Sequence, residues 1–288
     1  MLIAGRIIKG IGGFYYVKTA DALVECRARG VFRNQAQTPM VGDYVVIDRA
    51  PDGTGLVCEL KERKNTFIRP PISNIDVMVL VAAVKNPKPD LSFLDKMTII
   101  AAYQRVDLIV CFNKTDLIDN VNTMANIYRT IGYQVIETST IQNVGIEKLK
   151  GFLQGKTTAF AGFSGVGKSS LLSAISGRKL EIGAVSKKLS RGRHTTRQVE
   201  LLEYDKNTYL VDTPGFSMLE LPDMKKEELQ YYFREFEPYF DKCQFRGCSH
   251  TVEKGCAVLK ALADGNIVKS RHDNYVLFYN ILSDRKEW

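Results

Sequence analysis

Short apolar runs separated by glycine-containing turns fill the first 70 residues of the chain. The runs concentrate β-branched and aromatic residues, as β-strands do, and pairs such as Gly12-Gly13 and Asp52-Gly53 are typical of the turns between strands. Four runs are expected to form strands, at residues 5–10, 13–17, 23–29 and 43–48. About five short strands in about 70 residues predict a small all-β barrel, most simply an OB-fold, with an SH3-like barrel as the alternative.

From residue 72 to residue 220, apolar runs alternate with segments of helical spacing. Strands are expected at 76–83, 106–112, 135–137, 158–161 and 209–211, and helices at Leu91–Tyr103, Ile146–Leu153 and 168–175. This alternation predicts an α/β domain with a mostly parallel sheet and helices on both faces. Pro70-Pro71 stiffens the backbone and marks the boundary with the barrel.

Residues 221–288 are predicted to be mainly α-helical, with an irregular segment in the middle. Apolar residues at helical spacing are found at 229–240, 257–262 and 276–282. The protein is therefore expected to be multidomain, with domains at residues 1–70, 71–220 and 221–288.

The composition is that of a soluble globular protein, since 45% of the 288 residues are hydrophobic and 25% are charged. No apolar run approaches the roughly 20 residues of a membrane span, and the chain does not begin with a basic and then apolar leader. We expect a cytoplasmic monomer that has no membrane partner.

The formal net charge is +8, and part of the excess is concentrated in residues 178–197, where only Glu181 is acidic. This segment predicts a polyanionic partner such as RNA, although a solvated surface is the simpler alternative. Its basic residues are Arg178, Lys179, Lys187, Lys188, Arg191, Arg193 and Arg197.

Residues 162–169 match the phosphate-binding P-loop pattern G-x-x-x-x-G-K-[ST]. A strand is expected before the motif and a helix after it, and the positive end of that helix favours phosphate. Lys168 is expected to neutralise the β- and γ-phosphates as a catalytic residue, and Ser169 to bind Mg²⁺. The other nucleotide contacts of this motif are expected from Gly162, Ser164, Gly165, Val166, Gly167 and Ser170.

Asn113-Lys114-Thr115-Asp116 follows an expected strand and matches the motif that reads guanine. The Asp116 carboxylate can accept hydrogen bonds from guanine N1–H and from the exocyclic amine, whereas adenine would leave it unpaired. Asn113 is expected to hold the base edge and its loop, and the stem of Lys114 to pack on the base. Ser139 is expected to add a second base-binding loop, with an ordinary strand end as the alternative.

Asp212-Thr-Pro-Gly215 follows the last expected strand and matches a further GTPase motif. Asp212 is expected to hold Mg²⁺ through water, and the Gly215 N–H to contact the γ-phosphate. Either Thr195 or Thr196 completes the Mg²⁺ shell, with Thr196 slightly preferred. Because the guanine motif precedes the P-loop, the reverse of the usual order, the α/β domain is predicted to be a circularly permuted GTPase that binds GTP and GDP.

Phe216 stands where many GTPases have a glutamine that orients the attacking water. Phenylalanine cannot make this hydrogen bond, so either unaided hydrolysis is slow or another group acts. His194 is the candidate catalytic residue, because an imidazole can orient or deprotonate water beside the expected threonines. A surface histidine that faces phosphate or RNA is the alternative.

Cys243, Cys248, His250 and Cys256 place three thiols and one imidazole within fourteen residues. This set suits a tetrahedral Zn²⁺ with no open position, so one structural zinc ion per chain is expected in the C-terminal domain. Disulfides are the alternative, but a reducing compartment and the histidine favour a metal.

The barrel, the permuted motifs and the Cys/His cluster together resemble the small-ribosomal-subunit-dependent GTPase A family (RsgA, YjeQ and YloQ) along the whole chain. The signature segments are residues 113–116, 162–170, 192–197, 212–216 and 243–256. The family also has a hydrophobic residue at the position of Phe216. The resemblance implies a late assembly factor that binds the small subunit and its rRNA. It also implies GTP hydrolysis that the subunit stimulates and that is coupled to release.

Two other functions are weighed against this interpretation. A P-loop kinase or transferase would need an acceptor site that no motif here supplies, and Asp116 favours guanine. An RNA-binding, GTP-regulated module with little hydrolysis of its own is compatible with Phe216.

Overall fold

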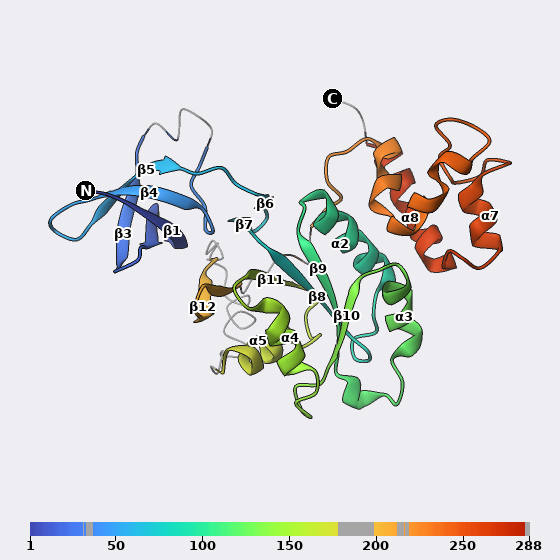
Figure 1. Ribbon diagram of the computed structural model, residues 1–288, viewed down its shortest axis with the longest axis horizontal. Coiled ribbons are helices and arrows are strands. Elements are labelled where there is room, and N and C mark those ends of the chain that lie inside the picture. Colours follow the sequence, from blue (N-terminus) through green and yellow to red (C-terminus); the bar gives the residue numbers. More distant parts are fainter. Residues whose placement is uncertain (31, 33–36, 178–198, 212–215, 217–218, 286–288) are drawn as a thin grey trace, which may run out of the picture.

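The computed structural model of the chain describes residues 1–30, 32, 37–177, 199–211, 216 and 219–285 (Figure 1). A β-barrel, a central α/β sheet and a C-terminal group of helices follow one another along the molecule in sequence order. The predicted succession of an all-β, an α/β and a mainly helical part is therefore confirmed. None of the described helices has the length and apolar character needed to cross a membrane.

Five strands close the barrel in the order β1-β2-β3-β5-β4, with β3 and β5 parallel and the other pairs antiparallel. This order is OB-like, so the first of the two predicted barrels is the correct one. Ile7, Val17, Ile47 and Val57 fill the interior and are fully buried. The strands are β1 (Leu2–Ile11), β2 (Phe14–Lys18), β3 (Leu23–Ala28), β4 (Tyr44–Arg49) and β5 (Gly55–Leu60).

A short hairpin of β6 (Thr66–Ile68) and β7 (Pro71–Ser73) connects the barrel to the sheet. The sequence predicted only a stiff break here. The hairpin is fastened to the barrel through Asp43, which is fully buried and accepts hydrogen bonds from Ser73 Oγ (2.5 Å) and from Arg63 Nε (2.7 Å). The connection is therefore an ordered element that fixes where the barrel sits.

Six strands form the central sheet in the order β10-β9-β8-β11-β13-β12. All are parallel except β12, which runs antiparallel to β13 at one edge. Every residue of β8 is buried, which explains its uninterrupted apolar sequence. The strands are β8 (Val77–Ala83), β9 (Asp107–Asn113), β10 (Gln134–Thr138), β11 (Thr157–Ala161), β12 (Leu201–Asp205) and β13 (Thr208–Val211).

Helices cover both faces of the sheet, as the alternating pattern predicted. Side chains of β8 alternate between a core with α2 (Leu91–Tyr103) and α3 (Asn122–Thr130) and a core with α4 (Ile146–Leu153) and α5 (Lys168–Ser176). The sequence predicted neither α3 nor β12. Helix α3 is mostly polar and has a single buried side, and β12 is a short edge strand.

The C-terminal part contains η4 (Lys226–Tyr232), η5 (Arg234–Lys242), α7 (Ala257–Ala263) and α8 (Lys269–Ser283). The α-helix predicted over 229–240 is wrong, because η4 and η5 are two 3₁₀ helices separated by Phe233 in an extended conformation. Pro238 explains part of the difference, since it lacks the N–H that an α-helix interior needs.

A buried arginine joins the barrel to the central sheet. Arg6 of β1 is 7% exposed and donates hydrogen bonds to Thr157 Oγ1 of β11 (2.7 Å) and to two backbone oxygens. Its guanidinium also lies over the rings of Tyr44 and Tyr209. Burial lowers the pKa of Arg6, because the charged form loses its hydration, and the nearby Tyr44, Asp76, Tyr209 and Asp43 offset only part of that loss.

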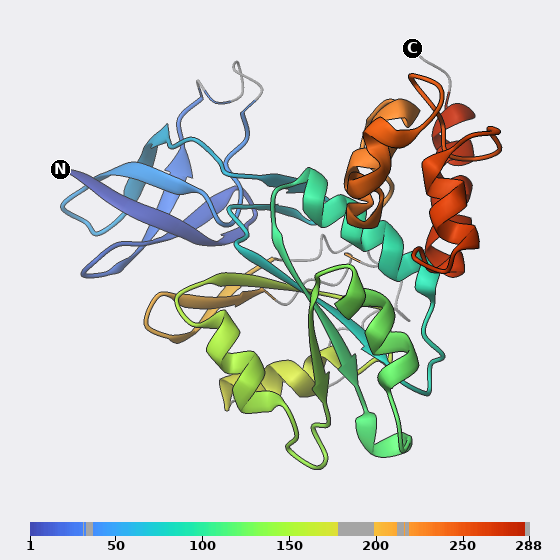
Figure 2. The same cartoon turned by 45° about the vertical axis from the view of Figure 1, so that its right-hand side comes forward.

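Helix α2 lies between the sheet and the C-terminal helices (Figure 2). One side packs on the sheet through residues such as Phe93 and Met97, and Ile99 on the other side belongs to the core of the C-terminal part. The helix is thus buried on opposite sides, which fits its largely apolar sequence.

A buried cluster of charges fastens α8 to α2. Arg271 of α8 is 1% exposed and pairs with Asp95 of α2 and with Glu235 of η5, each at 2.7 Å. Asp95 also accepts hydrogen bonds from Tyr128 Oη (2.9 Å) and Asn274 Nδ2 (2.6 Å). Burial alone would lower the pKa of Arg271, but the two carboxylates outweigh it and raise the pKa.

Replacing Arg271 with methionine should destabilise the protein severely. The substitution leaves Asp95 and Glu235 without a counter-charge in the interior, which costs about 3–5 kcal/mol of the free energy of unfolding. Lys269→Met is the matched control on the same helix, because Lys269 forms only an exposed pair with Asp273. Denaturant unfolding of both variants checks the prediction, and equal midpoints would contradict it.

Candidate functional site

The predicted base-reading and P-loop motifs meet at the carboxyl edge of the sheet. Strand β9 ends at Asn113, β10 ends at Thr138 just before Ser139, and β11 ends at Ala161 just before Gly162. Strands β9 and β10 are neighbours in the sheet, and β8 lies between β9 and β11. All of them run parallel, so their carboxyl ends lie at the same edge of the sheet (Figure 1). This is where α/β sheets bind ligands.

The buried side chain of Asn113 connects these motifs. Its Nδ2 donates a hydrogen bond to the backbone oxygen of Val166 in the P-loop (2.9 Å). Its Oδ1 accepts one from Thr138 Oγ1 (3.0 Å), which lies opposite Asn113 in the β9–β10 register. Asn113 is 1% exposed, so both bonds are shielded from water. One amide thus fixes the P-loop relative to the base-reading segment.

Two P-loop positions must be glycine, because a neighbouring atom lies where a Cβ atom would be. A Cβ atom at Gly167 would lie 2.2 Å from Nδ2 of Asn113, and one at Gly162 would lie 2.3 Å from the backbone oxygen of Val81. Both glycines have positive φ, which other residues rarely adopt. The glycines therefore let the loop pack against Asn113 and Val81, in addition to leaving room for phosphate.

Hydrogen bonds hold the side chains of the base-reading segment in place. Ser139 Oγ donates a 2.5 Å hydrogen bond to Asp116 Oδ1, and the Gln142 N–H donates to Ser139 Oγ (3.1 Å). Lys114 has a left-handed backbone, and its Nζ donates to the backbone oxygen of Asn86. The structure thus brings the predicted residues Asp116 and Ser139 together, with the Asp116 carboxylate held in place.

The other P-loop residues lie between the end of β11 and the first turn of α5. Lys168 begins α5, and its Nζ donates to the backbone oxygens of Gly162 (2.7 Å) and Phe163 (2.8 Å). Ser164 and Gly165 are exposed at the tip of the loop, whereas Val166 is buried in the core. Ser169 and Ser170 are half-buried in the first turn of α5.

Five predicted site residues, and the basic segment at 178–197, lie outside the residues that the structure describes. The structure therefore does not place His194, Thr195, Thr196, Asp212 or Gly215.

Phe216 is described, and it is 1% exposed. Its ring meets that of Phe67 in β6 edge-on, with the centroids 5.1 Å apart. The side chain belongs to the core that the barrel and the α2 face of the sheet share. A buried ring cannot contact an attacking water, in agreement with the sequence.

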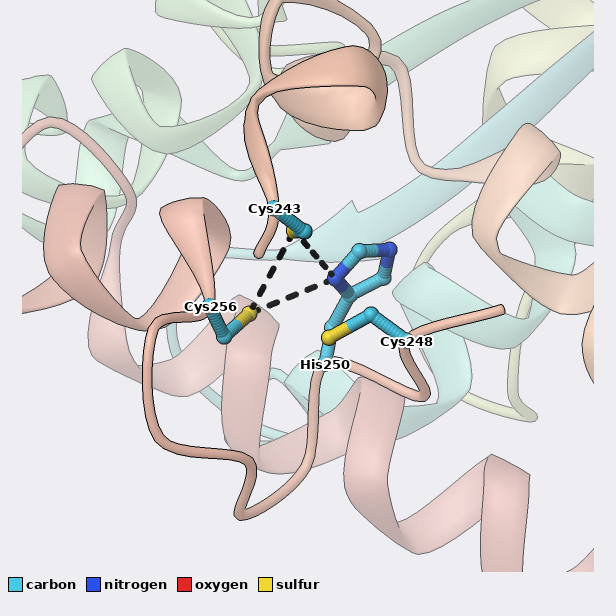
Figure 3. Close-up of side chains that lie close together, drawn as sticks. All are labelled: Cys243, Cys248, His250 and Cys256. Atoms are coloured by element: carbon cyan, nitrogen blue, oxygen red, sulfur yellow. Dashed lines mark hydrogen bonds between the residues drawn. The ribbon is translucent and has the colours of Figure 1, made fainter. Parts of the chain in front are cut away.

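The Cys/His residues form a compact cluster in the C-terminal part (Figure 3). Their ligand atoms all lie within 4.8 Å of one another. The Sγ atoms of Cys243 and Cys256 are 3.9 Å apart, too far for a disulfide, and His250 Nδ1 lies 3.6 Å and 3.3 Å from them. A tetrahedral ion bound at about 2.3 Å to sulfur and 2.0 Å to nitrogen would space its ligands about 3.5–3.8 Å apart. The cluster can therefore hold a metal ion.

Burial favours the neutral forms of the cluster residues. Burial raises the pKa of the Cys248 thiol to about 12 and lowers the pKa of His250. The imidazole is thus neutral, as a ligand must be, and a bound cation would offset the burial that disfavours thiolates. The loop is held by Glu253, which accepts hydrogen bonds from the Ser249 and Thr251 N–H groups. Burial opposes ionisation of Glu253, but hydrogen bonds from Ser249 and from the backbone N–H groups of Glu253 and Val252 lower its pKa to about 2.

Sequence reasoning missed several supporting residues. Thr138 adjoins the predicted Ser139, and only the strand register reveals that it faces Asn113. The contact of Asn86 with Lys114 uses a backbone oxygen, and Gln230, which contacts His250, is twenty residues away. No sequence signal points to either.

Replacing Thr138 with valine should weaken guanine nucleotide binding roughly tenfold, on the scale of one buried hydrogen bond. The change removes the hydroxyl that orients the Asn113 amide toward the P-loop. Thr138→Ser keeps the hydroxyl and should bind like the wild type. Displacement of a fluorescent guanine nucleotide measures both affinities, and equal losses in the two variants would refute the role of the hydroxyl.

Two family models match successive parts of the chain. Residues 4–57 match the RsgA N-terminal domain family, and residues 60–222 match the RsgA GTPase family. The small ribosomal subunit biogenesis GTPase RsgA of Caldanaerobacter subterraneus is 43% identical over 288 residues, covering 99% of this chain and 96% of that protein. The protein of the same name from Bacillus subtilis is 43% identical over 293 residues, covering 98% of each chain.

Solved structures agree. YjeQ from Thermotoga maritima superposes with a TM-score of 0.86 at 34% identity, covering 99% of this chain and all of that one. YloQ, described as a circularly permuted GTPase, gives a TM-score of 0.82 at 37% identity, covering 100% of this chain and 97% of that one. With two family matches and relatives of this identity over nearly its whole length, the chain belongs to the RsgA family of circularly permuted GTPases.

Proposed function

We propose that the protein hydrolyses GTP as an assembly factor of the small ribosomal subunit, and that it binds the subunit and its rRNA. The observation that carries the proposal is the joint at Asn113, where the base-reading segment and the P-loop become one site. The names of the full-length relatives support the subunit as partner. A cytoplasmic monomer is consistent with this role.

The roles of the nucleotide site follow from its chemistry. Asp116, held by Ser139, reads guanine, and Asn113 and Lys114 frame the base. The P-loop N–H groups and Lys168 bind the phosphates. Ser169 and Asp212 hold Mg²⁺ together with Thr195 or Thr196, and Gly215 contacts the γ-phosphate. Mg²⁺ would supply charge neutralisation at the phosphates.

His194 is proposed as the group that orients the attacking water. The support is indirect: Phe216 is packed against Phe67, so the residue that follows the Asp212–Gly215 motif contributes nothing polar. Contact of the basic segment 178–197 with rRNA would place His194 and the neighbouring threonines. Such placement by rRNA would explain why the subunit stimulates hydrolysis and how hydrolysis could be coupled to release.

Zinc is proposed as the ion of the Cys/His cluster, one per chain and structural. Three thiolates and one imidazole complete a tetrahedron and leave no open position for catalysis. All four ligands lie between η5 and α7, with Cys243 directly after η5 and Cys256 directly before α7, so the ion would tie the facing ends of the two helices into one folded unit.

GTP turnover should be slow for the protein alone and rise strongly with purified small ribosomal subunits. Large subunits, and ATP as substrate, are the controls and should give no increase. His194→Ala should lower the stimulated rate by about 100-fold or more, while GTP affinity stays near that of the wild type.

Turnover indifferent to small subunits would remove the proposed partner. Nucleotide and rRNA binding without stimulated turnover would favour the RNA-binding, GTP-regulated module instead. An unchanged rate in His194→Ala would remove that residue from catalysis.

A further inference from the structure

A glutamine outside the Cys/His cluster contacts its histidine. Gln230 lies in η4, between the sheet and the cluster in sequence, and its Oε1 is 2.9 Å from His250 Nε2. On the other side of the same amide, Nε2 donates a 2.9 Å hydrogen bond to the backbone oxygen of Glu227. A carbonyl can only accept, so this second bond fixes which end of the amide faces the ring.

The orientation of Gln230 determines the state of the imidazole. Because its oxygen faces His250, the facing ring nitrogen, Nε2, must carry the hydrogen. The opposite nitrogen, Nδ1, then has a lone pair, and it points toward Cys243 Sγ and Cys256 Sγ (Figure 3). A neutral imidazole with its lone pair among thiols is the form that binds a metal ion.

We propose that Gln230 is a positioning residue of the metal site, which selects Nδ1 of His250 as the ligand atom by accepting the hydrogen of Nε2. Metal-binding histidines commonly donate their second N–H to such a partner, which fixes the ring and strengthens the ligand. The inference rests on the proposed metal function of the cluster and adds a residue and a ligand atom to it.

The backbone of His250 is held separately from its ring. His250 has a left-handed backbone with φ 59°, and its carbonyl accepts a 2.8 Å hydrogen bond from His272 Nε2 of α8. Phe236 and Phe240 of η5 lie against the ring and offer no polar group. Among the described residues, Gln230 is therefore the polar side chain that contacts Nε2 and determines the tautomer. It also links the cluster to η4, which packs on α2 and α8.

The test is the affinity of the full-length protein for Zn²⁺, measured by competition with a chromophoric chelator. Gln230→Leu removes the acceptor and should weaken Zn²⁺ binding about 10–100-fold. Gln230→Glu keeps an acceptor oxygen and should retain the affinity. Glu227→Leu is the matched control, because it changes an exposed side chain of the same 3₁₀ helix and should leave the affinity unchanged.

The tautomer of the His250 ring can be measured directly in the wild-type protein. Long-range ¹H–¹⁵N NMR of the zinc-loaded protein should show His250 protonated on Nε2 and metal-bound through Nδ1. Metal bound through Nε2 would overturn the proposal, even if Gln230→Leu fails to fold. Equal Zn²⁺ affinities of Gln230→Leu and the wild type would overturn it too. A wild type that binds no Zn²⁺ would instead refute the metal function on which the proposal rests.

Discussion

The nucleotide site depends on one buried amide, that of Asn113. The base-reading segment follows β9 and the P-loop follows β11, and β8 lies between these two strands. The amide joins the two segments, with Nδ2 on the P-loop backbone and Oδ1 on Thr138 of the neighbouring strand β10. Gly167 must be a glycine because the amide occupies the space of its Cβ. A hydrogen bond shielded from water is strong and directional, so base and phosphates are expected to bind as one ligand.

The parts on either side of the sheet are joined to it by buried charge. Arg6 connects the barrel to β11, and Arg271 connects α8 to α2. Such contacts break only at high cost, so the three parts are expected to move together at these joints. Lys9 of β1 also forms a bridge and a 3.0 Å salt bridge with Glu200, directly before β12. The described residues directly before β12 are therefore anchored on the barrel.

Much of the fold could be predicted because apolar periodicity reports burial directly. Strand β8 and helix α4 follow from their apolar patterns, and the P-loop motif and the Cys/His spacing each specify a local arrangement that the structure has. The misses have physical causes. The buried side of helix α3 is too narrow to give a clear apolar period in the sequence. The segments η4 and η5 have apolar residues at helical spacing, but their backbone is not α-helical. The partners of Asn113 and His250 are set by strand register and tertiary packing, which no single segment encodes.

Competition between GDP and ADP for the purified protein tests most directly whether the permuted segments form one guanine nucleotide site. If Asp116 reads the base while the P-loop holds the phosphates, GDP should displace a bound fluorescent guanine nucleotide. ADP should be weaker on the order of 10⁴-fold, because adenine lacks the N1–H and amine donors that the Asp116 carboxylate is expected to accept from guanine. An ADP affinity within about tenfold of the GDP affinity would mean that the protein binds the phosphates without recognising the base. The hydrogen bonds of Asn113 would then not join base recognition to phosphate binding, as proposed.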